Sequence, residues 1–137
     1  LQILETRREL DRLIARSAAS RANASERDAM TAIAQSMETA VKSGDLVAFL
    51  QWDNEMNRQA ALSARNMVAA SAVAALHSAS RRFWFYHHQG QANATLRLHV
   101  ALARAIASGK PEKAAEASDR LIDDLFDFAT RTLITRT

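Results

Sequence analysis

Apolar and polar residues alternate along most of this chain with a spacing of roughly three to four positions, the period of an α-helix. In the first segment the apolar stripe runs through Ile3, Leu10 and Ile14. No stretch alternates with a period of two, so strands are not expected. The pattern and its breaks predict helices over residues 1–22, 25–43, 46–64, 67–86, 92–107 and from 111 onward.

The breaks between these segments carry residues that end and restart helices. Ser25 is the expected N-cap of the second helix. Gly44 suits the left-handed C-terminal cap of that helix, and Asp45 suits the N-cap of the third. Pro111 fits the first turn of the last helix, where its missing N–H is not needed. Because short connections make consecutive helices run antiparallel, the sequence predicts an all-α fold, an antiparallel bundle of about six helices.

Composition narrows the class of protein. The 137 residues fit a single domain, and the chain contains no cysteine. Disulfides and thiolate metal sites are therefore excluded, and a cytoplasmic location is expected. No apolar run approaches the ~20 residues of a membrane span, so no membrane partner is expected. The net charge of +3 is spread along the chain, without a recognition motif, which makes direct DNA binding by this chain unexpected.

Some predicted inward faces carry polar side chains. Asp53 and Asn57 lie one turn apart on the apolar stripe of the third helix. His99 lies beside the stripe of the fifth helix, and Arg7 falls on the inward side of the first. A buried carboxylate is costly unless it is paired or bound to a cation. These residues indicate either structural contacts, such as a salt bridge and a hydrogen-bonded core histidine, or a polar pocket inside an apolar bundle.

Three other features have mostly structural interpretations. Asp119, Asp123 and Asp127 repeat at four-residue spacing, which is typical of a solvated helix face. His87 and His88 are expected at the surface, at the end of a helix. The aromatic run over residues 83–86 covers nearly a full turn, so its members cannot all face one core, and some should meet a partner or line a pocket.

The sequence patterns of several enzyme classes are absent. There is no Glu-x-x-His pair for a di-iron bundle and no His-Glu-x-x-His for a zinc hydrolase. No glycine-rich phosphate loop is present, and no serine nucleophile has a convincing base. The chain is therefore not expected to be an enzyme.

Several segments in order resemble the FCD effector domain found in many GntR-family transcription regulators. They are Leu-Glu-Thr-Arg-Arg-Glu-Leu-Asp at 4–11, Ser-Gly-Asp-Leu-Val-Ala-Phe-Leu-Gln-Trp-Asp at 43–53, and the histidine helix at 99–106 with the alanine-rich turn at 109–115. The resemblance covers essentially the whole chain. It implies a homodimeric effector-binding domain that reaches DNA only through an N-terminal winged-helix domain. Since Leu1 already reads as helical, that domain is expected to be missing here.

Many members of that family hold a divalent metal with one aspartate and three histidines. By this resemblance Asp53 matches the aspartate and His99 the middle histidine. Asn57 and Leu121 stand where the family has its other two histidines. A firm transition-metal site normally has three or more good side-chain donors. The resemblance therefore implies a divalent metal, zinc or nickel, that is weakly held or lost, and no firmly bound cofactor.

The expected function is the sensing of a small organic acid, with the signal passed to DNA-binding domains. The expected site comprises Arg7, Asp53, Asn57 and His99, with Arg81 of the fourth helix as a further contact. Arg7 would bind a carboxylate through its planar guanidinium. The alternative is a stand-alone helical scaffold or protein-interaction module without a small ligand, in which Asp53 and Arg7 form a buried salt bridge.

Overall fold

The computed structural model describes residues 1–88 and 93–135. Within these residues the chain forms six α-helices and no strand, which confirms the predicted all-α class. The helices are α1 (Gln2–Arg21), α2 (Ala24–Ser43), α3 (Leu46–Ala64), α4 (Met67–His87), α5 (Asn93–Ala107) and α6 (Pro111–Thr135). None of these described helices has the length and apolarity needed to cross a membrane. The predicted start of the fifth helix at residue 92 lies outside the described residues.

The helix ends follow the cap residues, with one correction. Gly44 adopts a left-handed conformation with φ of 72°, and the Asp45 side chain accepts a hydrogen bond from the Ala48 N–H at 3.0 Å, as predicted. The prediction that Ser25 caps α2 was wrong. Asn23 is the cap, because its side chain accepts from the Glu26 N–H while the Glu26 carboxylate accepts from the Asn23 N–H. This reciprocal capping box requires a glutamate three residues after the cap.

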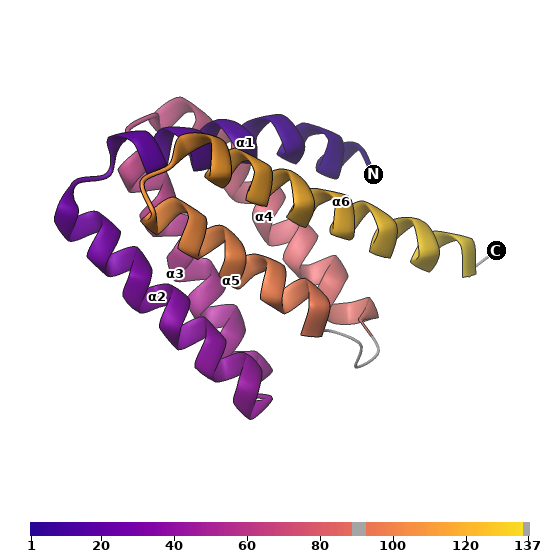
Figure 1. Ribbon diagram of the computed structural model, residues 1–137. Coiled ribbons are helices and arrows are strands. Elements are labelled where there is room, and N and C mark those ends of the chain that lie inside the picture. Colours follow the sequence, from indigo (N-terminus) through magenta and orange to yellow (C-terminus); the bar gives the residue numbers. More distant parts are fainter. Residues whose placement is uncertain (89–92, 136–137) are drawn as a thin grey trace.

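Small side chains let the helices pack closely. Five alanines, one on each of α1, α2, α3, α5 and α6, are fully inaccessible to solvent: Ala18, Ala34, Ala64, Ala103 and Ala114. Figure 1 shows α1 and α6 side by side and running in opposite directions, with α2 and α5 forming a second such pair. The helix α4 packs chiefly on α1 and buries only Ala69, Val73 and Trp84. This sparse packing leaves space on the inner side of α4.

Salt bridges join α1 to α6 along their outer edge. Asp119 and Asp123 were expected to be a solvated face, but both also pair with arginines of α1. The pairs are Arg8–Asp123 at 2.6 Å, Arg12–Asp119 at 2.9 Å and Arg16–Glu112 at 3.3 Å. Their order along the two helices matches the antiparallel arrangement. Partly exposed pairs such as these stabilise a fold only weakly.

Candidate functional site

A cavity of about 460 Å³ is bounded by residues of α1, α3, α4, α5 and α6. This volume lies in the range of about 300–1,000 Å³ that is usual for small-molecule pockets. Its walls are mainly apolar and include Phe49, Met56, Val73, Trp84, Leu96 and Leu121. All five predicted site residues also line it: Arg7, Asp53, Asn57, Arg81 and His99. These five predicted residues, which come from four different helices, thus meet at one cavity.

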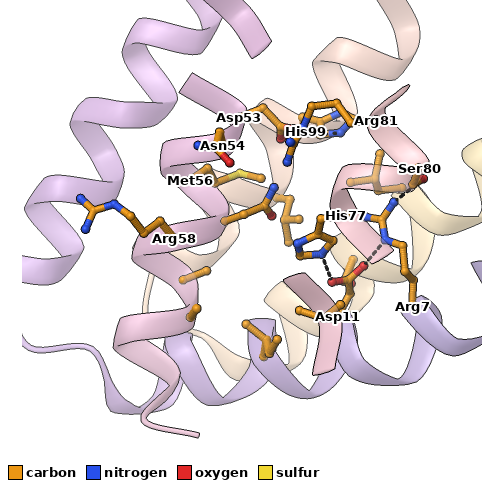
Figure 2. A pocket seen from close by; sticks show the side chains of 18 of the residues that line it. Arg7, Asp11, Asp53, Asn54, Met56, Arg58, His77, Ser80, Arg81 and His99 are labelled. Carbon is orange, nitrogen blue, oxygen red and sulfur yellow. Dashed lines mark hydrogen bonds and ion pairs between the residues drawn. The ribbon is translucent and has the colours of Figure 1, made fainter. Parts of the chain in front are cut away.

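Asp53, Arg81 and His99 form a loosely joined group that we call the open cluster (Figure 2). Asp53 Oδ2 lies 3.5 Å from Arg81 Nε, and Asp53 Oδ1 lies 3.8 Å from His99 Nε2. Both distances exceed the ~2.8 Å of a charge-assisted hydrogen bond. Asp53 Oδ1 and Arg81 Nε are buried and have no hydrogen-bond partner among residues 1–88 and 93–135. The open cluster therefore retains unused bonding capacity inside the protein.

The His99 ring is held in one orientation. Its Nδ1 lies 2.9 Å from the Thr95 carbonyl oxygen, and the ring packs perpendicular to that of Phe49. A carbonyl oxygen can only accept, so Nδ1 carries the hydrogen and the neutral ring has its lone pair on Nε2. That lone pair and Asp53 Oδ1 are both acceptors. Because Asp53 Oδ1 is inaccessible to solvent, a hydrogen-bond donor reaches both acceptors only when side chains of the open cluster shift.

A second group, which we call the closed cluster, comprises Arg7, Asp11, His77 and Ser80. The Arg7 guanidinium donates to Asp11 Oδ2 at 2.9 Å and to Ser80 Oγ at 2.8 Å. His77 Nε2 lies 2.6 Å from Asp11 Oδ1. Figure 2 shows these contacts as a continuous network between α1 and α4, apart from the open cluster. Its polar groups are largely satisfied by one another.

Electrostatics favour the charged form of Asp11. Burial alone would raise the pKa of this carboxyl, but the hydrogen bond with His77 and the positive charge of Arg7 outweigh it, so the pKa lies below its ordinary value. The salt bridge considered between Asp53 and Arg7 is not formed, because Arg7 pairs with Asp11 and the arginine beside Asp53 is Arg81.

The residues present do not fit a firmly held transition metal. Asp53 and His99 supply one carboxylate and one imidazole, Asn57 supplies a weakly ligating amide, and Leu121 supplies only hydrocarbon. In the part of the chain that the structure describes, no group of three or more His, Asp or Glu could hold a metal ion. The Arg81 guanidinium also places a positive charge beside Asp53. A divalent cation would meet too few donors and a repelling neighbour.

The aromatic run at the end of α4 divides as its spacing predicts. Trp84 is buried and lines the cavity, and Phe83 packs edge-on against Phe128. Phe85 and Tyr86 are exposed. His87 and His88 end α4 as expected and are partly buried at the surface, His87 against Phe83 and His88 stacked on Trp84. The aromatic neighbours account for this burial.

Comparison with known families identifies the chain. Residues 2–124 match the family model of the FCD domain, a span that includes every member of the open and closed clusters. A search of curated proteins found no match. FCD domains are the effector-binding and oligomerisation domains of GntR-family transcription regulators, and they are regulatory rather than enzymatic. With its folded helices, its cavity and this match over most of its length, the chain belongs to the FCD domain family.

Proposed function

We propose that this chain senses a small organic acid, which binds in its cavity at the open cluster. The observation that carries the proposal is a pair of buried polar atoms, Asp53 Oδ1 and Arg81 Nε, that form no hydrogen bond within the described residues and belong to a mainly apolar cavity of ligand size. A buried polar group without a partner costs about 1–3 kcal/mol. A ligand that hydrogen-bonds to these atoms offsets that cost, which favours binding.

The proposed contacts follow from which groups are already engaged. Arg81 binds the ligand carboxylate, because its contact with Asp53 is loose, whereas the Arg7 guanidinium already donates to Asp11 and Ser80. Asp53 and His99 accept hydrogen bonds from the ligand. Asn57 lines the cavity from α3 and adds an amide contact. In this assignment Arg7 bounds the site and holds α4, a role different from the carboxylate clamp expected from sequence.

The closed cluster offers a route for the signal. It joins α1 to α4 and lines the same cavity as the open cluster, whose Arg81 lies one turn after His77 on α4. A ligand that binds Arg81 and shifts it therefore acts on α4, the helix that the closed cluster joins to α1. To switch a regulator, the ligand must bind one arrangement of these helices more tightly than the other.

The proposal includes a homodimer that contacts DNA through a separate winged-helix domain joined to α1. Family membership supports this architecture, since FCD domains also serve oligomerisation. Sedimentation equilibrium at tens of micromolar checks the dimer, and a purely monomeric chain would contradict it.

Replacing Arg81 tests the site. The ligand is the organic acid that, among those tested, raises the melting temperature of the chain most. Arg81→Gln should weaken its binding at least ten-fold, because a charged hydrogen bond contributes about 1.5–3 kcal/mol. Isothermal titration calorimetry measures the affinity, and far-UV circular dichroism checks that the helices persist. Arg58→Gln is the matched control: Arg58 also borders the cavity, but its side chain is 61 % exposed and pairs with Glu55. Unchanged affinity in Arg81→Gln removes Arg81 from the site.

A further inference from the structure

We infer that the open cluster binds a zwitterion, an α-amino acid with an apolar side chain. Its carboxylate pairs with Arg81, and its ammonium group lies between Asp53 and His99. This inference rests on the proposed sensing function and narrows the chemical class of the ligand. It is carried by three observations: the acceptors that face each other, the balance of charge in the cavity, and the apolar walls.

The hydrogen-bonding pattern favours an ammonium group. Asp53 Oδ1 and His99 Nε2 lie 3.8 Å apart, and both accept in the neutral ring. A nitrogen about 2.9 Å from each can donate to both, since an ammonium group carries three hydrogens. A hydroxyl has one hydrogen and can satisfy only one of the two acceptors. A carboxylate has none and is repelled by Asp53.

The charge lining the cavity also favours a zwitterion. Apart from His77 and His99, which also line the cavity and carry charge only when protonated, Arg7 and Arg81 contribute two positive charges and Asp11 and Asp53 two negative charges. These four groups sum to zero. Arg58 also lines the cavity, but its charge is exposed and paired with Glu55. A ligand with one positive and one negative group leaves the balance unchanged. A simple carboxylate or a simple amine adds an uncompensated charge to a largely buried site, which is unfavourable.

The remaining walls suit an apolar side chain. Leu121 is 3 % exposed and lines the cavity where the resemblance places a metal-binding histidine in other members. Met56 and Trp84 line it as well and are also buried. Hydrocarbon at these positions gives a ligand side chain apolar surface to bury, at about 25 cal/mol per Å². Leu121 thus gives the cavity apolar surface at the position where the resemblance implies a metal ligand.

A matched set of compounds tests the inference. The chelator-treated chain is titrated calorimetrically with L-leucine and L-phenylalanine. Each is compared with the acid that lacks the amino group, 4-methylpentanoate or 3-phenylpropanoate, and with the amine that lacks the carboxylate, 3-methylbutylamine or 2-phenylethylamine. We expect at least one amino acid to bind at one site per chain. Both of its partial analogues should bind at least ten-fold more weakly, because each leaves one half of the open cluster unpaired.

Two substitutions test whether Asp53 binds the ammonium group of the ligand and Arg81 its carboxylate. Asp53→Asn should weaken the amino acid at least ten-fold. It should not weaken the deaminated acid, since that acid lacks the group that Asp53 binds and is freed from repulsion by the Asp53 charge. Arg81→Gln should weaken both compounds. Asp28→Asn, at an exposed carboxylate of α2, is the matched control and should change neither affinity.

The outcomes separate this inference from the proposed function. If a deaminated acid binds as tightly as its amino acid, the zwitterion is wrong while organic-acid sensing stands. If an amine binds as tightly, the assignment of Arg81 to a carboxylate is wrong as well. If neither amino acid binds, the inference is overturned, and the proposed function is then judged by a wider set of acids.

Discussion

Replacing Asp11 with alanine should lower the free energy of unfolding by about 3 kcal/mol, since removing one partner of a buried ion pair strands the charge of the other. The substitution deprives both Arg7 and His77 of the carboxylate they contact, and the Arg7 side chain is only 9 % exposed. Urea unfolding followed by circular dichroism at pH 7 measures the change. Asp127→Ala, at an exposed carboxylate of α6, is the control and should cost no more than about 0.5 kcal/mol.

The difference in unfolding free energy between wild type and Asp11→Ala should become smaller at low pH. Burial raises the pKa of Asp11, but the His77 hydrogen bond and the Arg7 charge together lower it by more than burial raises it. The pKa in the folded state therefore lies below that in the unfolded chain. The stabilisation by this carboxylate is therefore complete above the unfolded pKa of about 3.9 and is lost as the pH falls through the lower folded value. The difference between wild type and Asp11→Ala should shrink below about pH 4. A difference that stays constant down to pH 3 would contradict this explanation.

Restoring two histidines should give the cavity a tight metal site. In the double variant Asn57→His, Leu121→His, Asp53 and His99 are joined by the two imidazoles that the family resemblance implies. We expect affinity for zinc at least 100-fold above that of the wild type, because four good donors replace two. Adding Arg81→Ala should raise the affinity further by removing the neighbouring positive charge. Calorimetric titration of chelator-treated proteins measures each affinity.

A second double variant controls for histidine number. Gln51→His, Leu121→His adds the same two residues, but Gln51 is exposed, does not line the cavity and lies two positions before Asp53, so its side chain leaves α3 in another direction. It should gain little affinity. Equal zinc affinity in the wild type and in Asn57→His, Leu121→His would show that the wild-type donors already suffice, contrary to the fit argued above.

Local patterns explain why the helices could be predicted from sequence. The apolar period, Gly44, Asp45 and Pro111 act within one or two turns, so their effect is readable without knowledge of packing. The error at the start of α2 is also local. Asn23 and Ser25 are both good cap residues, and only the partner Glu26 three positions after Asn23 distinguishes them.

The site was predictable only in part. Asp53 and His99 were identified because a polar residue on or beside an apolar stripe is conspicuous, and the structure brings both to the cavity. Asp11 and His77 were missed. The two are 66 positions apart, and their contact depends on how α1 packs against α4. Which arginine meets which aspartate likewise depends on helix packing, so the pairing of Arg81 with Asp53 could not be derived from spacing.

The central claim is that an organic acid binds in the cavity without a metal. Its most direct test is thermal unfolding of the chelator-treated chain with a panel of hydroxy, keto, dicarboxylic and amino acids. Each acid is measured without metal and again with equimolar zinc. We predict that at least one acid raises the melting temperature by about 5 °C or more near a hundred times its Kd, equally with and without zinc. Stabilisation that requires zinc, or no stabilisation by any acid of the panel, would contradict this account.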